Sequence, residues 1–352
     1  MKVVSIVGAR PQFIKAAPLS RLLRRSHREI LVHTGQHYDN NMSTVFFEEL
    51  DIPAPEYNLG VGSGPHGQQT GTMLSRIEQV LIDENPDWVL VYGDTNSTLA
   101  GALAASKLHI KVAHVEAGLR SFNRDMPEEI NRIVADHLST LLFCPSQTAV
   151  DNLANEGISH DAHLVGDVMA EALAFAVERA QDHSNILQRL QLEDNRYLLA
   201  TVHRAENTDH AERLGSILEA FNALDEPLVF PIHPRTKKAI HDLGISLSGN
   251  VRLIEPVGYL DMVRLMQSAR MILTDSGGIQ KEAYWLEVPC ITMRDETEWV
   301  ETIESGWNML VGAESGQIVQ AVQLNKRPDN HPNLYGDGQT ARRCVTLLDQ
   351  YG

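Results

Sequence analysis

The sequence predicts an α/β protein made of two doubly wound domains, each built on a parallel sheet. Short runs of β-branched residues alternate with amphipathic segments along the whole 352-residue chain, a pattern typical of βαβ units. The alternation pauses near Gly166 and restarts near Leu198. Since a chain of this length accommodates two domains, we expect a boundary at about residues 165–170 and a cleft where the domains meet.

The first half of the chain contains the elements of one such domain. Apolar runs rich in valine, isoleucine and leucine predict buried strands at residues 3–7, 30–34, 89–92, 112–115 and 141–144. Amphipathic segments predict helices at residues 16–25, 43–50, 67–84, 97–108, 128–138 and 148–156. A polar, helix-rich stretch from about residue 170 to 196 then separates the two halves.

The second half repeats the same alternation. Strands are predicted at residues 198–201, 228–232, 251–254, 271–274 and 290–293. Helices are predicted at residues 211–223, 236–243, 260–268, 278–285 and 317–324. A loop rich in proline, asparagine and glycine follows, and the chain closes with a helix at residues 340–350.

Composition excludes several classes of function. The formal net charge of −16 argues against a surface for nucleic acid or anionic membrane. The first apolar run is too short for a signal peptide, and no window reaches the length of a membrane span. Three widely separated cysteines without metal spacing suit buried thiols in a reducing cytoplasm. We therefore expect a cytoplasmic enzyme or binding protein with a small ligand.

The turn after residue 274 has the features of a phosphate-binding site. An apolar run ends at Asp275, and Ser276, Gly277 and Gly278 then lead into a helix-forming segment. Ser276 is suited to cap that helix, the glycines allow a close approach of ligand, and helix N-termini attract phosphate. Glu282 lies within the first two turns, within reach of a hydroxyl beside the phosphate. The alternative is a turn that only changes the direction of the chain.

Cations follow the first strand of each predicted domain. Arg10 and Lys15 flank a glycine turn after residue 7, and His203 and Arg204 follow the strand that ends at residue 201. Because ligands bind at the carboxyl ends of parallel strands, these side chains suit a diphosphate. His203 also suits acid/base work and is a candidate catalytic residue. The alternatives are solvated charges at helix starts and a buried, hydrogen-bonded histidine.

Three carboxylates follow the neighbouring strands and the next helix start. Asp94 comes after residues 89–92, Glu116 after residues 112–115, and Glu128 opens the helix at 128–138. An acid that directly follows a buried strand is costly without a partner or a task. Asp94 and Glu128 taken singly also suit helix N-termini. Together the three suit proton transfer at a weakly acidic C–H beside a leaving phosphate.

Other chemistries lack their signatures. The histidines and cysteines show no metal-site spacing, no Gly-x-Gly-x-x-Gly follows a strand, and no Gly-x-Ser-x-Gly elbow occurs. We therefore expect no metal and no redox cofactor.

These residues together carry a resemblance to a known family. The segments at residues 8–11, 93–95, 114–120, 127–132, 203–204 and 275–278 occur in one order along the chain. The set resembles the non-hydrolysing UDP-N-acetylglucosamine 2-epimerases, and it spans essentially the whole sequence.

The resemblance implies a fold and a reaction. The fold is of the GT-B type, with two Rossmann-like domains facing a central cleft and a C-terminal helix that crosses back to the first domain. The first domain would comprise residues 1–167 with helix 338–352, and the UDP-binding domain residues 168–337. The reaction would convert UDP-GlcNAc to UDP-ManNAc by elimination and re-addition of UDP, without metal or cofactor, for surface polysaccharide synthesis. A homodimer is expected from the family.

The resemblance also assigns roles to residues. Asp94, Glu116 and Glu128 would be acid/base residues, and His203 and Arg10 would hold the diphosphate, with Lys15 near them. The set that binds UDP and sugar comprises Arg10, Lys15, His203, Arg204, Ser276, Gly277, Gly278 and Glu282, with Glu282 on the ribose hydroxyls.

One departure bears on the sugar. The family's usual Thr-Glu-Arg-Pro-Glu reads Thr-Glu-Trp-Val-Glu here, with Trp299 in place of the arginine. The pattern is also similar to epimerases of UDP-2,3-diacetamido-2,3-dideoxy-glucuronate, whose carboxylate Lys281 or Arg294 could face; the alternative is that both side chains are solvated surface charges. A GT-B glycosyltransferase and a catalytically silent nucleotide-sugar sensor are the remaining alternatives.

Overall fold

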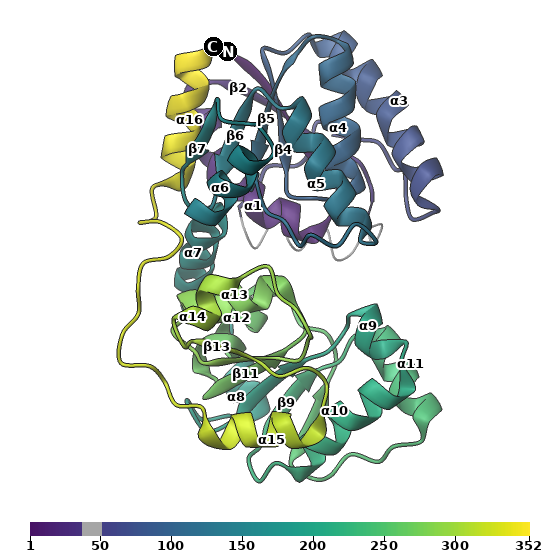
Figure 1. The fold of residues 1–352 in the computed structure, drawn as a ribbon, viewed down its shortest axis with the longest axis vertical. Helices are drawn as coiled ribbons and strands as arrows, with labels where there is room; N and C mark the ends of the chain where they lie inside the picture. The colour runs from purple at the N-terminus through teal and green to yellow at the C-terminus, as the bar shows by residue number, and fades with distance from the viewer. Residues whose placement is uncertain (37–50) are drawn as a thin grey trace. The chain divides into compact units, whose positions relative to one another are not determined.

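The computed structural model describes residues 1–36 and 51–352 and divides into two compact units (Figure 1). Unit 1 comprises Met1–Phe175 and Asn333–Gly352, and unit 2 comprises Ala176–Pro332. The boundary predicted between residues 167 and 168 falls at the start of helix α7 (Val168–His183), whereas the two units divide within that helix.

Unit 1 is built on a seven-stranded parallel sheet in the order β3-β2-β1-β4-β5-β6-β7. The strand order reverses between β1 and β4, which is where doubly wound folds bind ligands. The strands are β1 (Lys2–Val7), β2 (Arg28–His33), β3 (Tyr57–Asn58), β4 (Trp88–Tyr92), β5 (Lys111–Val115), β6 (Leu141–Cys144) and β7 (Ala162–Leu164). The helices besides α7 are α1 (Arg10–Ser26), α3 (His66–Glu84), α4 (Asn96–Lys107), α5 (Pro127–Leu138), α6 (Gln147–Asn155) and α16 (Thr340–Tyr351).

Helices cover both faces of this sheet. Alternate residues of β1, Val4 and Ile6, pack in one core with apolar side chains of α3, α4 and α5. Since successive strand residues point to opposite faces, Ser5 faces the other side. There Glu29 accepts hydrogen bonds from Ser5 and from Ser20 of α1. Burial on both faces explains why these strands read as continuous apolar runs.

The predicted return of the C-terminal helix to the first domain is confirmed. Helix α16 packs on α1, and Figure 1 shows it, in yellow, beside β7. The backbone N–H of Ala341 donates to Glu171 over 2.9 Å, and the Tyr351 hydroxyl donates to Asp161 over 2.8 Å.

Unit 2 is built on a six-stranded parallel sheet in the order β10-β9-β8-β11-β12-β13. Its strands are β8 (Leu198–Thr201), β9 (Leu228–Pro231), β10 (Val251–Ile254), β11 (Met271–Thr274), β12 (Cys290–Thr292) and β13 (Asn308–Leu310). Its helices are α8 (Ile186–Leu190), α9 (Ala205–Thr208), α10 (Ala211–Ala223), α11 (Pro234–Leu243), α12 (Tyr259–Ser268), α13 (Gly277–Trp285), α14 (Val300–Glu304) and α15 (Ser315–Leu324). The predicted fold class, two parallel-sheet α/β domains, is confirmed.

The differences from the predicted elements lie at sheet edges and helix starts. Helix α1 begins at Arg10, not at residue 16, because Pro11 has no N–H to leave unpaired and Gln12 accepts a hydrogen bond from the Ala9 amide over 3.1 Å. The sequence analysis missed β3, β7 and β13, which are edge strands of at most three residues. The helix predicted at residues 43–50 lies outside the described residues. In the part of the chain that the structure describes, no helix is long and apolar enough to cross a membrane.

Candidate active site

Two of the predicted carboxylates follow the carboxyl ends of the neighbouring strands β4 and β5 in unit 1. The two strands pair in register from Trp88 with Lys111 to Tyr92 with Val115. Glu116 follows β5 directly and Asp94 follows β4 after Gly93, so both lie at the edge of the sheet where parallel strands present ligand-binding residues.

Glu116 is held in a specific position by its backbone and by a cation. Its φ of +71° lies in the left-handed region, where a side chain of this size is uncommon. The Lys15 ammonium, from α1, forms an ion pair with the Glu116 carboxylate, and both side chains are largely buried. Neighbouring Gly93 has φ +61°, and a Cβ there would come within 2.9 Å of the Lys15 Nζ. The turn therefore requires glycine to leave room for this ion pair.

Asp94 is held by an arginine from α5. The Arg132 guanidinium donates to the Asp94 Oδ2 from Nη2 over 2.6 Å and from Nε over 3.0 Å. The Asn131 side chain donates to the backbone carbonyl of Asp94 over 2.9 Å. The Asp94 side chain remains 30% exposed, so its carboxylate is fixed in orientation and still accessible.

The two glutamates at the start of α5 differ in environment. Glu128 is exposed on the first turn of the helix. Glu129 is buried and accepts hydrogen bonds from the Ser121 and Phe122 amides, each over 3.0 Å, and from Arg132 over 2.8 Å. Burial alone would raise the pKa of Glu129, but these hydrogen bonds and the Arg132 charge hold it below its ordinary value. Glu129 therefore orders the loop before α5, and Glu128 is the accessible acid of the pair.

The remaining unit 1 residues predicted for the site lie on α1. Arg10 is the first residue of this helix and is partly exposed, and Lys15 lies in its second turn. The structure thus brings Lys15 and Glu116 into contact, with Asp94 on the adjacent strand end and Glu128 on the helix that supplies Arg132.

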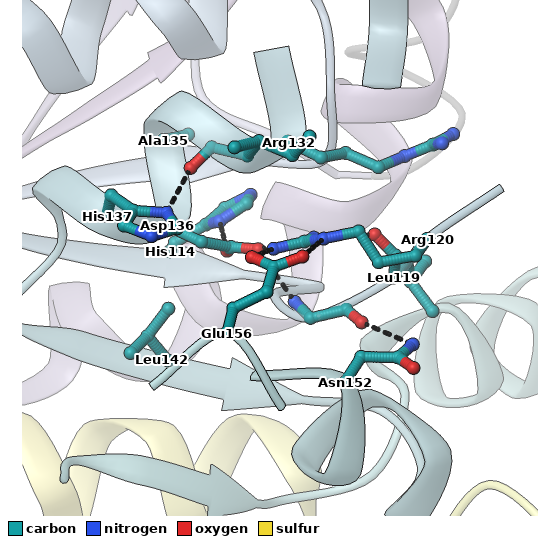
Figure 2. A network of polar contacts seen from close by, with 12 residues as sticks. His114, Leu119, Arg120, Arg132, Ala135, Asp136, His137, Leu142, Asn152 and Glu156 are labelled. Atoms are coloured by element: carbon teal, nitrogen blue, oxygen red, sulfur yellow. Dashed lines mark hydrogen bonds and ion pairs between the residues drawn. The ribbon is translucent and has the colours of Figure 1, made fainter. Parts of the chain in front are cut away.

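A largely buried polar network joins His114, Arg120, Asp136 and Glu156 in unit 1 (Figure 2), and it was not predicted from the sequence. The Asp136 Oδ1 lies 2.7 Å from His114 Nδ1, and its Oδ2 accepts from Arg120 over 2.7 Å and from the Gly118 amide over 3.1 Å. Arg120 continues to Glu156 through two hydrogen bonds of 2.7 and 2.8 Å. The one available signal was a histidine inside an apolar strand.

In unit 2, Asp275 organises the loop that carries the predicted cations. It is fully buried at the end of β11. Its carboxylate accepts from the His203 amide over 3.1 Å and from the Arg204 amide over 3.0 Å. The Asn207 side chain also donates to it over 3.2 Å. The sequence analysis treated Asp275 as part of a turn, whereas the structure makes it the anchor of a second segment.

Residues 276–278 form the start of helix α13, as predicted. Ser276 is the N-cap by backbone conformation, although its side chain makes no capping hydrogen bond. The Ser276 amide instead donates to Thr274 Oγ1 over 2.9 Å. A Cβ added to Gly277 would have its nearest neighbours at 3.5 to 3.7 Å, and one added to Gly278 would have a single neighbour at 3.9 Å. These are ordinary van der Waals distances; Gly277 is half-buried and Gly278 is exposed, so the helix start is reached from solvent at Gly278.

The other predicted unit 2 residues surround this helix start. The Arg204 Nη2 lies within 3.7 Å of the Cβ position of Gly277. The His203 ring is 44% exposed, with Nδ1 3.8 Å from Asp275 Oδ1. Glu282 is buried on α13 and accepts from the Tyr259 hydroxyl over 3.0 Å.

Two buried cations lie near the residue that departs from the family pattern. The Lys281 Nζ sits 3.8 Å from the centroid of the Trp299 ring, a favourable cation–π distance. Arg294 donates to Glu298 over 3.1 Å and is buried with it. Burial opposes ionisation of Glu298, but Arg294, with a smaller contribution from Arg204, holds the pKa of that carboxyl below its ordinary value. Neither cation is solvated, which corrects the alternative that both are surface charges.

The described residues contain no group of three or more His, Cys, Asp or Glu side chains arranged to hold a metal ion. Their reactive groups are two carboxylates at adjacent strand ends in unit 1, each paired with a cation, and a helix start with an arginine nearby in unit 2. The first arrangement suits proton transfer, and the second suits a phosphate group.

Comparison with known proteins identifies the family. The family model described as UDP-N-acetylglucosamine 2-epimerase matches residues 21–349. A UDP-N-acetylglucosamine 2-epimerase homolog from Methanococcus maripaludis is 53% identical over 99% of both chains. The UDP-2,3-diacetamido-2,3-dideoxy-D-glucuronate 2-epimerase of Pseudomonas aeruginosa is 51% identical, again over 99% of both.

A solved structure agrees over the whole chain. The crystal structure of Methanocaldococcus jannaschii UDP-GlcNAc 2-epimerase in complex with UDP-GlcNAc and UDP has a TM-score of 0.92 at 46% identity and covers all of both chains. The GT-B-like architecture is therefore shared. The chain belongs to the non-hydrolysing UDP-N-acetylglucosamine 2-epimerase family, whose members are isomerases.

Proposed function

We propose that the protein interconverts UDP-GlcNAc and UDP-ManNAc by inverting carbon two of the sugar. The observation that carries the proposal is the pair of carboxylates, Asp94 and Glu116, at adjacent strand ends, each held by its own cation. A pair of acids in different environments suits a reaction that removes a proton on one face of a carbon and returns it on the other.

The proposed reaction proceeds through elimination. A carboxylate removes the proton from carbon two, the bond between carbon one and the phosphate oxygen breaks, and UDP leaves with the electron pair. A double bond between carbons one and two results. A carboxylic acid then returns a proton to carbon two on the opposite face, and the UDP oxygen re-adds at carbon one. We assign these transfers to Asp94, Glu116 and Glu128 and include no metal or redox cofactor.

The departing UDP requires its own binding groups. We assign the phosphates to the α13 start at Ser276, Gly277 and Gly278, with His203 and Arg204 beside it. The N-terminal amides and dipole of the helix favour negative charge, and arginine binds phosphate with directed hydrogen bonds. We assign Arg10 and Lys15 to the charge that develops on the leaving group and Glu282 to the ribose hydroxyls.

A second substrate is a specific candidate. The P. aeruginosa relative named for UDP-2,3-diacetamido-2,3-dideoxy-D-glucuronate is 51% identical. Lys281 and Arg294 also lie beside Trp299 and Glu298, where this chain departs from the usual family motif. A cation in this region would suit the carboxylate of an acidic sugar.

One experiment tests both candidates. The protein is incubated in D2O with UDP-GlcNAc and, in parallel, with the diacetamido-glucuronate nucleotide, and the sugar signals are followed by proton NMR. We expect UDP-ManNAc to appear with deuterium at carbon two. Turnover of the acidic nucleotide alone would assign the second substrate. No epimer and no deuterium with either nucleotide would contradict the proposal.

We also propose that the enzyme acts in the cytoplasm as a homodimer and supplies an activated sugar for surface polysaccharide. The support is family membership. The molar mass measured by light scattering during size-exclusion chromatography tests the dimer. A monomer at the concentration of the activity assay would contradict it. Loss of the polysaccharide on gene deletion, restored by the wild-type gene, tests the cellular role.

A further inference from the structure

We propose that Asp136 is a positioning residue for the reaction, which sets the placement of both Asp94 and Glu116 by holding His114 with one oxygen and the Gly118 segment with the other. The inference rests on the proposed function for its kinetic consequence. Its structural part stands on hydrogen bonds alone.

The first step concerns the protons on His114. Its Nδ1 lies 2.7 Å from Asp136 Oδ1, and its Nε2 lies 2.7 Å from the Gly93 carbonyl oxygen. A carbonyl oxygen only accepts. Burial opposes ionisation of Asp136, but His114 and Arg120 hold its pKa below the ordinary value, so it accepts as well. Each ring nitrogen therefore faces an acceptor, and each carries a proton.

These hydrogen bonds hold the backbone beside Asp94 and beside Glu116. Gly93 is the residue before Asp94, so the His114 ring fixes the carbonyl at the start of the Asp94 turn. The other Asp136 oxygen accepts from the amide of Gly118, two residues after Glu116. One carboxylate thus controls the backbone beside both acids.

The backbone in these segments needs such support. Gly93, Glu116 and Gly118 have φ of +61°, +71° and +80°. For Glu116, which has a side chain, the left-handed conformation is strained and persists where surrounding contacts impose it. The space at Gly118 is also fixed, since a Cβ there would lie 2.3 Å from the Ala149 carbonyl oxygen.

The side chains of this network are buried, which makes their charges costly to desolvate. The side chains of His114, Arg120 and Asp136 are at most 1% exposed, while Glu156 at the outer end is 27% exposed. Asp136 also faces the Cys144 thiol, whose pKa is raised to about 12 by burial and by the Asp136 charge. Buried ion pairs often stabilise a fold no more than apolar residues of the same volume. A geometric role for Asp136 accounts for two cations and a carboxylate in this core.

Kinetics of Asp136→Asn test the proposal. The amide keeps the shape of the side chain but cannot accept at both of its ends. We expect kcat to fall by on the order of 100-fold, the effect of a misplacement near 1 Å, with KM and UDP affinity unchanged. His114→Gln removes one of the two ring donors and should likewise lower kcat while leaving KM and UDP affinity unchanged. It replaces Asp136→Asn in the test if that variant does not fold.

Glu29→Gln is the matched control. Glu29 is a buried carboxylate of unit 1 that pairs with Arg24 over 2.8 Å and with Ser5 over 2.7 Å, but it lies at the amino end of β2. We expect this variant to lose thermal stability and keep kcat. A kcat for Asp136→Asn equal to that of the control, or a joint rise in KM, would overturn the positioning role.

A spectroscopic measurement needs no substrate. In protein with 15N-labelled histidine, nitrogen–proton correlation spectra should show His114 with both ring nitrogens protonated, and with one in Asp136→Asn. A neutral His114 ring in the wild-type protein would overturn the inference whether or not the protein is an epimerase. Absence of turnover in the wild-type protein with a doubly protonated His114 would instead contradict the proposed function.

Discussion

The two units present their functional groups in opposite ways. In unit 1 the carboxylates of Asp94 and Glu116 reach the edge of the sheet, and cations from α5 and α1 hold them in place. In unit 2 the carboxylate of Asp275 turns inward and binds backbone amides, and what remains at the surface is the start of α13 with His203 and Arg204.

The same βαβ edge thus presents acids when its aspartate points outward, and presents backbone amides and cations when its aspartate points inward. The proposed proton transfer rests on side-chain carboxylates in unit 1, whereas the proposed phosphate binding in unit 2 rests on the backbone at the α13 start together with the His203 and Arg204 side chains. Substitutions of the unit 1 carboxylates should therefore change the rate of the chemical step, and substitutions at the α13 start should change the affinity for UDP.

The largest effect is expected from Glu116→Gln. The amide keeps the side-chain volume but can neither take a proton from carbon two nor return one to it, so kcat should fall by about 10²- to 10⁴-fold. Steady-state kinetics of epimerisation measure it. Glu78→Gln, at an exposed position on α3, is the control and should behave as wild type. Full activity of Glu116→Gln would remove this residue from the proton transfer.

A smaller but broader effect is expected from Asp275→Asn. One amide cannot accept from both the His203 and Arg204 N–H groups without leaving its own NH2 unpaired, so the free energy of unfolding should fall by about 1–3 kcal/mol. UDP affinity should fall with it. Denaturant unfolding and calorimetry measure the two, with the exposed Asp242→Asn as control. Unchanged UDP affinity in the destabilised protein would show that the His203 loop does not bind UDP.

The effect of Gly277→Ala should be confined to binding. Its Cβ fits within the protein at ordinary contact distances, but it occupies the surface over the helix start. We expect UDP affinity to fall on the order of tenfold, equivalent to about 1.4 kcal/mol, with the melting temperature unchanged. Gly249→Ala, where a Cβ meets open space, is the control. Unaltered affinity in Gly277→Ala would move the phosphate away from α13.

The smallest effect concerns acid stability. The pKa of Glu298 lies below its ordinary value in the folded protein, so the ionised form stabilises unit 2 above that ordinary value. This stabilisation is lost as pH falls through the lower, folded-state pKa. Glu298→Gln should therefore reduce the loss of stability on acidification from pH 5 downward, measured by unfolding at a series of pH values. If the free energy of unfolding of Glu298→Gln fell as steeply below pH 5 as that of the wild-type protein, Glu298 would not be the source of this pH dependence.

The central strands of both sheets could be predicted from the sequence because they are continuous apolar runs, which flanking helices bury on both faces. Asp94 and Glu116 could be predicted as site residues because each stands within two residues of the end of such a run. The parallel order of strands then places residues of distant sequence at one edge.

The supporting contacts were not predictable in the same way. Asp136 reads as one polar residue of an amphipathic helix, and its role depends on which strand faces that helix. Lys281 and Arg294 read as surface charges, yet Trp299 and Glu298 fold over them. Pairings of this kind depend on tertiary packing, and local periodicity carries no signal for them.

The most direct test of the division between the units compares Glu116→Gln with Gly277→Ala. Each variant is measured for UDP affinity by calorimetry and for deuterium incorporation at carbon two with saturating UDP-GlcNAc. We expect Glu116→Gln to bind UDP as the wild-type protein does and to incorporate no deuterium at carbon two. We expect Gly277→Ala to bind UDP more weakly and to exchange at the wild-type rate once saturated. Loss of binding and exchange together in either variant would contradict the account.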